Sequence, residues 1–197
     1  MVRVVTTVDV HLPTDVWIGV PGEWTEETWS DHRDWAREVA DTVWAGASPG
    51  PGQQGPDHLA LSLTMLAESP LLELAWRRTF LWLPGPTSEL LPVHLEAYAS
   101  LGERAESLAE LTRADEPGAV EKPIVEPFPS EHLGEGIRVL RYAADPQDGA
   151  VVLTLSYAWR AGDLDVLLWL STFDTSLALR AMEDVDGLAR SVHLVDD

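Results

Sequence analysis

The stretch VVLTLSYAWRAGDLDVLLWLST, residues 151–172, contains the pattern that decides the fold. In its first half, residues 151–160, apolar side chains alternate with smaller or more polar ones, a period of two that is typical of a strand with one buried face. Residues 161–163, Ala-Gly-Asp, predict a turn. Residues 164–170 are almost continuously apolar, which indicates a second strand buried on both faces. The stretch therefore predicts a β-hairpin.

The segment after this hairpin predicts a helix that packs against it. Asp174 and Thr175 are suited to the start of a helix because their side-chain oxygens accept hydrogen bonds from free backbone N–H groups. An apolar stripe at helical spacing follows, made of Leu177, Ala178, Ala181, Met182, Val185, Leu188, Ala189 and Val192. The hairpin and this helix are therefore the expected core unit of the fold, although they carry no chemical signature.

The rest of the chain predicts further strands and helices. Strands are expected at residues 2–12, 16–20, 75–83, 93–99 and 137–142. Thr25 is expected to cap a first helix that ends near Gly46, with Trp24 and Trp29 placed as a hydrophobic staple. Asp57 is expected to cap a second helix that ends before Pro70, and residues 103–113 favour a third.

These elements place the chain in the α+β class. Helices that are segregated from a mostly antiparallel sheet define that class. We expect a single α+β domain over residues 1–197, with a flexible Pro/Gly loop at residues 46–56. Residues 115–135 are rich in proline and acid, and we expect extended surface backbone there, held by Ile124, Val125 and Phe128.

Composition limits the classes of function. The formal net charge of −20 argues against sequence-independent nucleic-acid binding, which needs a basic footprint. The absence of cysteine excludes disulfides, thiolate catalysis and cysteine zinc sites. No apolar run approaches the ~20 residues of a membrane span, and residues 1–12 lack the apolar core of a signal peptide, so we expect a cytoplasmic protein with no membrane partner. Depletion of Lys, Asn and Ile is typical of a high-GC bacterial genome, in which acidic proteins are common.

The order of elements resembles the PsbP-like α+β sandwich, a fold used by small bacterial proteins. The resemblance rests on the opening strand, on the helix between Trp24 and Trp44, and on the Tyr157–Trp159 hairpin with its following helix. It covers about two thirds of the chain by layout and includes no family motif. It implies the fold, and functions on that fold are mainly binding or assembly.

Catalytic and metal-binding motifs are weak in this sequence. Residues 46–50 match G-x-S-x-G, but a helix rather than a strand precedes them, so the nucleophile elbow is not formed. Residues 31–34 offer Asp, His and Asp on a solvated helix face. Asp9 and His11 share a strand face and could begin a metal site, but a catalytic zinc needs three ligands. A third would have to come through the fold from His58, His94, His132 or His193. Acidic pairs such as Asp163 and Asp165 arise readily by chance in so acidic a chain. We expect no catalytic residue, metal or cofactor.

The candidate binding residues are Trp76, Arg77, Arg78 and Trp82. Arg77 and Arg78 are adjacent in the sequence, and aromatic residues lie on both sides of the pair. Arginine stacks on tryptophan and grips carboxylate or phosphate, and both residue types are enriched in interfaces. The alternative is a core strand whose outward arginines face an acidic surface.

The sequence supports two main hypotheses for function. The first is a non-enzymatic module that binds another protein, of adaptor, chaperone or immunity-inhibitor type, with an acidic surface that attracts a basic partner. The second is a small-ligand-binding protein or unrecognised enzyme, with a pocket between sheet and helices that includes His11, His94 or Arg78. A DNA-mimicking acidic protein ranks last, because the acids are interspersed with apolar residues.

Overall fold

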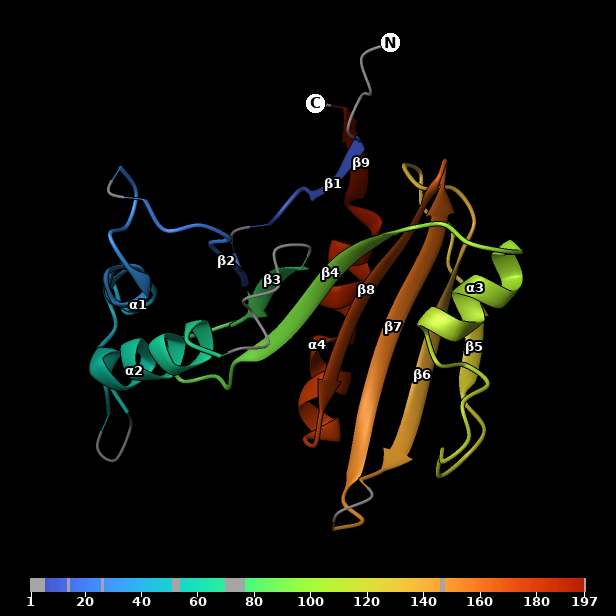
Figure 1. The fold of residues 1–197 in the computed structure, drawn as a ribbon. Coiled ribbons are helices and arrows are strands. Elements are labelled where there is room, and N and C mark those ends of the chain that lie inside the picture. The colour runs from blue at the N-terminus through green and yellow to red at the C-terminus, as the bar shows by residue number, and fades with distance from the viewer. Residues whose placement is uncertain are drawn as a thin grey trace. The chain divides into compact units, whose positions relative to one another are not determined.

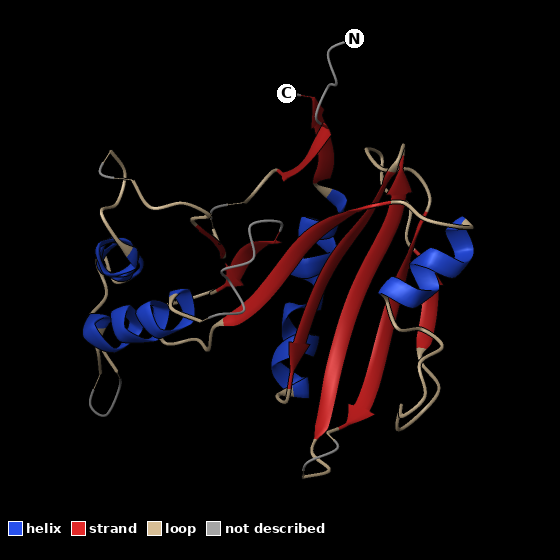
Figure 2. Cartoon of the chain, in the orientation of Figure 1, coloured by secondary structure: helices blue, strands red, loops and turns tan. Residues whose placement is uncertain are grey.

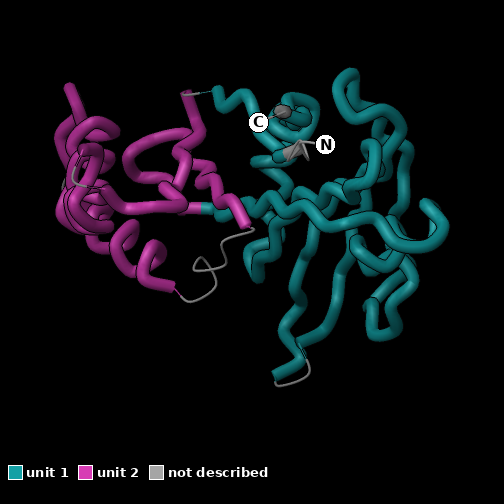
Figure 3. The backbone as a smooth tube through the Cα atoms, turned by 45° about the horizontal axis from the view of Figure 1, so that its top comes forward, with its two compact units in different colours: residues 1–13, 91–197 teal, residues 14–90 magenta. Residues whose placement is uncertain are grey.

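A computed structural model describes residues 6–13, 15–25, 27–50, 54–69, 77–145 and 148–196. The chain divides into two compact units (Figure 3). Unit 1 comprises residues 1–13 and 91–197, and unit 2 comprises residues 14–90. The single-domain organisation expected from the sequence stays a prediction.

Unit 1 is built on an antiparallel sheet with the strand order β4-β8-β7-β6-β5 (Figures 1 and 2). Its strands are β4 (Leu91–Ala99), β5 (Ile124–Pro127), β6 (Gly136–Ala144), β7 (Val151–Ala161) and β8 (Leu164–Thr172). A separate pair joins β1 (Thr6–Val10) to β9 (Val192–Asp196). The predicted hairpin is confirmed as β7 and β8, and Gly162 turns it with a φ of 62° that favours glycine.

Helix α4 (Thr175–Arg190) packs against β7 and β8, as expected. The Asp174 carboxylate caps it by accepting a hydrogen bond from the Leu177 N–H at 2.9 Å. Its buried residues are Leu177, Ala178, Ala181, Val185, Leu188 and Ala189, which confirms most of the predicted stripe. The strand β9 was not expected from the sequence, and it contains Val192, which the stripe placed on the helix.

The expectation that β7 buries one face is wrong at its centre, where all residues from Leu155 to Trp159 are buried. On one face Ala158 packs with Leu108 of α3 (Arg104–Leu111). On the other face Tyr157 reaches Asp186 of α4. Ser156 and Ala158 are small and lie between larger apolar residues. From the sequence alone, they therefore resemble the solvent-facing side of the strand. The two faces are called below the α3 face and the α4 face of the sheet.

The strand β5 forms an edge of this sheet and is only partly as expected. Phe128 is buried, but Ile124 and Val125 are about half exposed and do not pin the backbone. The Phe128 N–H donates to the Gly136 carbonyl at 2.9 Å. Because backbone hydrogen-bonding groups alternate in direction along an antiparallel strand, those of residues 123, 125 and 127 point away from β6. Two of these are prolines, which lack an N–H group. The edge is therefore poorly suited to pairing with a further strand.

Unit 2 contains β2 (Trp17–Val20), β3 (Arg77–Trp82), α1 (His32–Val43) and α2 (Pro56–Ala67). The strands pair antiparallel, and the helices pack together. The core of unit 2 consists of Trp35, Ala36, Ala40, Trp44, Leu59, Ala60, Leu63, Leu81 and Leu83.

Both helix starts in unit 2 differ from the prediction. Asp31, not Thr25, caps α1, because its carboxylate accepts from the N–H groups of Arg33 and Asp34. Gly55, not Asp57, is the N-cap of α2, and Pro56 occupies the first helical position, where its fixed φ is favourable. Among the described residues, no helix has both the length and the apolarity to cross a bilayer.

Candidate protein-binding surface

The structure places the sequence-predicted binding residues on β3, except for Trp76, which lies outside the described residues. Arg78 is exposed, and its guanidinium carbon is 5.9 Å from the centroid of the Phe80 ring. Arg77 is half-buried, whereas Trp82 is only 5% exposed. Such burial is typical of the core-strand alternative, and the binding role of this segment stays a prediction.

The other candidates from the sequence do not converge. Asp31 is occupied as a helix cap, and His32 Nε2 lies 2.8 Å from Glu68 Oε1. His11 is exposed, while His94 is buried with its ring 4.7 Å from that of Trp169. In the described part of the chain, no group of three or more His, Asp or Glu side chains is arranged to hold a metal ion.

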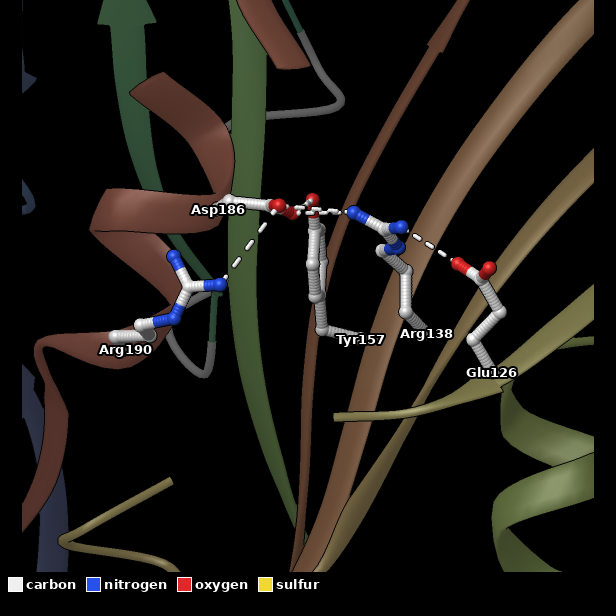
Figure 4. A network of polar contacts seen from close by, with 5 residues as sticks. All are labelled: Glu126, Arg138, Tyr157, Asp186 and Arg190. Carbon is white, nitrogen blue, oxygen red and sulfur yellow. Dashed lines mark hydrogen bonds and ion pairs between the residues drawn. The ribbon is translucent and has the colours of Figure 1, made fainter. Parts of the chain in front are cut away.

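A polar network joins β5, β6, β7 and α4 on the α4 face (Figure 4). Arg138 of β6 donates to both carboxylate oxygens of Asp186, at 3.0 and 2.8 Å, and to Glu126 of β5 at 2.5 Å. The Tyr157 hydroxyl donates to Asp186 at 2.6 Å. Arg190, one helical turn after Asp186, lies 3.9 Å from the same carboxylate. The network fastens the C-terminal half of α4 to three strands.

The electrostatics of this network argue against a general base at Tyr157 or Arg138. Burial, and then the hydrogen bond to Asp186, raise the pKa of Tyr157. The pKa of Arg138 is raised mainly by its hydrogen bond to Glu126. Burial acts to lower this pKa, and the contacts with Asp186 raise it further. Tyr157 therefore stays protonated and Arg138 charged near neutral pH, so neither can serve as a general base.

A second network lies at the β7–β8 turn and anchors the chain before α3. Arg160 grips the buried Asp165 carboxylate through Nε at 2.6 Å and Nη2 at 2.8 Å, and Ser107 of α3 donates to it at 2.6 Å. Arg160 also donates to the carbonyls of Leu101 and Gly102. Burial acts to raise the pKa of Asp165, but the hydrogen bonds from Arg160 and Ser107 outweigh it and the pKa is lowered.

The outward face of α2 is the surface with the clearest capacity to bind. Leu61 and Met65 are 57% and 65% exposed, and their i, i+4 spacing places them side by side on one ridge. His58 and Ser62 form the adjacent row of the helix. That row lines a groove of about 610 Å³, whose opposite wall is the loop of residues 86–90. We call Leu61, Met65 and this groove the α2 surface.

Sequence reasoning missed the α2 surface although a signal was present. It predicted a helix after Asp57 without examining its outward side, and in the structure Leu59 and Leu63 form the buried side. The outward leucine and methionine make the helix apolar on both sides. A helix that is apolar all round is normally enclosed in a protein interior, so exposure of one side is the unusual feature.

Comparison with known proteins gives distant similarity only. No family model matches the chain, and no curated protein matches it. A crystal structure of LpqN, involved in cell envelope biogenesis of Mycobacterium tuberculosis, aligns over 98% of this chain and 86% of that chain, with 10% identity and a TM-score of 0.45. The Ran-binding protein Mog1p of Saccharomyces cerevisiae aligns over 66% of this chain and 82% of that chain, with 12% identity and a TM-score of 0.40. The PsbP-like resemblance stays a prediction.

Proposed function

We propose that this protein is a non-enzymatic module that binds another protein, and that the α2 surface is its docking site. The observation that carries the proposal is the exposure of Leu61 and Met65 at the centre of the solvent face of α2. Apolar side chains grouped beside a groove are typical of helix-in-groove recognition, and methionine adapts to the shape of a partner. A cytoplasmic adaptor, chaperone or immunity-type inhibitor is the class that this surface fits.

The charge of the chain defines the chemistry of the partner. With a formal net charge of −20, the protein attracts basic partners and repels acidic ones. Asp57 lies in the first turn of α2, Glu68 is its C-cap residue, and Glu89 lines the opposite wall of the groove. We therefore expect a partner segment with apolar anchors flanked by lysine or arginine. Its association rate should fall as salt screens the attraction.

Affinity capture with three forms of the full chain tests this function. The forms are the wild type, the double variant Leu61→Glu/Met65→Glu, and Leu179→Glu, a control at a leucine on α4 that is 50% exposed. In lysate of the source organism, we expect a stoichiometric basic partner with the wild type and with Leu179→Glu. We expect its loss with the double variant and at high salt. Retention by the double variant would exclude the α2 surface, and no partner at either salt would exclude the function.

Small-ligand binding is a second candidate function, favoured by the same groove. Its lining brings together polar side chains of His58, Ser62, Ser88 and Glu89 with apolar ones of Leu59 and Leu90. A metabolite screen by thermal shift distinguishes this candidate from the first. A ligand whose stabilising effect disappears in Ser62→Trp, a change that fills the groove, would support small-ligand binding.

A further inference from the structure

Arg141 of β6 is a buried arginine with an incomplete set of partners. It is 7% exposed, and its Nε has no hydrogen-bond partner. Its Nη2 donates to the Pro117 carbonyl over a long 3.5 Å. Within the described ranges, no carboxylate lies at ion-pair distance from it, whereas Arg138 and Arg160 each hold one closely. A buried cation without a counter-charge is costly, so such a group usually has a role outside packing.

Two residues with hydroxyl side chains, Thr154 and Ser171, lie in line with Arg141 on the two neighbouring strands. In the strand register Arg141 is opposite Thr154 of β7, and Thr154 is opposite Ser171 of β8. Directly opposed residues have Cβ atoms about 4.5–5.5 Å apart. The Thr154 and Ser171 hydroxyl oxygens are 3.3 Å apart. The three residues therefore form one row on the α3 face, opposite to the face that carries Asp186.

This row runs from the interior to the solvent. Arg141 is buried, Thr154 is half-buried and Ser171 is exposed. The apolar cluster of Leu108, Ala158 and Leu167 occupies another part of the same face. Arg141 therefore lies at the buried end of the row and Ser171 at its solvent end.

We propose that Arg141, Thr154 and Ser171 form a binding site for an oxyanion, namely a phosphate or a carboxylate. A guanidinium presents planar, parallel N–H donors that match two oxygens of such a group. The two hydroxyls donate to a further oxygen. The bound anion supplies the negative charge that Arg141 otherwise lacks. This site is separate from the α2 surface and does not depend on the proposed function.

Because the chain is strongly acidic, an anion is expected to bind only where local donor groups outweigh the overall repulsion. A net charge of −20 repels free anions from most of the surface. Only a donor group that is buried, and so poorly screened, can offset this repulsion locally. Exposed arginines such as Arg180 lack that advantage, and they serve as matched controls.

Thermal unfolding of the full chain tests the proposal. The wild type is titrated with sodium phosphate or sodium acetate, with chloride added to keep the ionic strength constant. We expect the midpoint to rise by about 4 °C at ten times the dissociation constant of the favoured anion. The two titrations decide between phosphate and carboxylate. The rise should disappear in Arg141→Met and persist in Arg180→Met.

Two results would overturn the site: no rise in the wild type with either anion, or an equal rise in Arg141→Met. The double variant Thr154→Val/Ser171→Ala gives an independent measurement if Arg141→Met does not fold. We expect it to weaken binding at least fivefold, because two donors are lost while Arg141 remains. An unchanged dissociation constant in that variant would remove the hydroxyls from the site.

Discussion

Arg138 and Arg141 are three residues apart on β6, yet they have opposite environments. Arg138 lies on the α4 face, where it donates two hydrogen bonds to Asp186 and one to Glu126. Asp186 also accepts a hydrogen bond from Tyr157. Arg141 lies on the α3 face, is more deeply buried, and has a single long hydrogen bond to a carbonyl. The strand alternates its side chains between two faces, so neighbours in sequence meet different layers.

The difference separates a structural network from a candidate binding group. A partly buried charge that is fully paired fixes the position of its neighbours, and in this protein Arg138 holds α4 against three strands (Figure 4). A buried charge that is poorly paired lowers stability unless another molecule compensates it. The number of partners around each arginine therefore distinguishes the two environments, which burial alone does not do.

The largest expected loss of stability comes from adding a side chain at Gly136, on the α4 face of the sheet. A Cβ at Gly136 would lie 2.2 Å from Trp159 Cδ1 and 2.8 Å from the Ala158 carbonyl oxygen. Gly136→Ala should therefore lower the free energy of unfolding by about 3 kcal/mol, since a buried indole or the backbone must move. Gly187→Ala on α4 is the control: nothing lies within 4 Å, and it should stabilise by about 0.5–1 kcal/mol. Urea unfolding measures both, and equal stabilities would contradict the packing.

Removing the paired arginine should have the next largest effect. Arg138→Met leaves Asp186 without its bidentate partner, and we expect a loss of about 2 kcal/mol, moderated because Arg138 is partly exposed. Urea unfolding at neutral pH measures the loss. Glu183→Gln, at an exposed position of α4, is the control and should change little. A loss as small as that of the control would mean that the network around Asp186 contributes nothing to stability.

Removing the poorly paired arginine should cost much less. In chloride buffer without phosphate or carboxylate, Arg141→Met should stay within about 0.5 kcal/mol of the wild type or be more stable, because an apolar side chain replaces an uncompensated buried charge. The same unfolding experiment makes the measurement. A loss comparable to that of Arg138→Met would show that Arg141 is structural, and the contrast between the two arginines would disappear.

The smallest expected effect is the pH dependence of stability that comes from Asp165. This carboxylate lies on the α3 face and, unlike Arg141, has close charged and polar partners. The pKa of Asp165 is lowered because Arg160 and Ser107 bind its carboxylate, despite its burial. The stability contributed by this group is fully present above the unfolded pKa, near 4, and is lost as the pH falls through the lower folded value. Carbon-detected NMR titration should show the Asp165 carboxyl titrating below the ordinary aspartate pKa of about 3.9. A pKa above that value would contradict the pairing.

The sequence predicted much of the fold but little of the binding surface. The hairpin and α4 were predictable because their periodicity and the Asp174 cap act over a few neighbouring residues. The start of α1 was misplaced because Thr25 and Asp31 are both good caps, and only the observed hydrogen bonds to Arg33 and Asp34 distinguish them. The sequence of α2 shows that the helix is apolar on both sides, but it does not show which side is exposed, so the exposure of Leu61 came only from the structure.

The sequence by itself determined the α+β class, the acidic charge and the exclusion of cysteine chemistry, because these depend on composition and on short periodic patterns. Only the tertiary structure decided which charges have partners. Arg138 and Asp186 are 48 residues apart in the chain, and they meet because α4 packs back onto β7 and β8, beside the strand that carries Arg138. The environment of Arg141 was likewise decided by chain pairing, which places Thr154 opposite it and brings the Pro117 carbonyl within reach of its guanidinium.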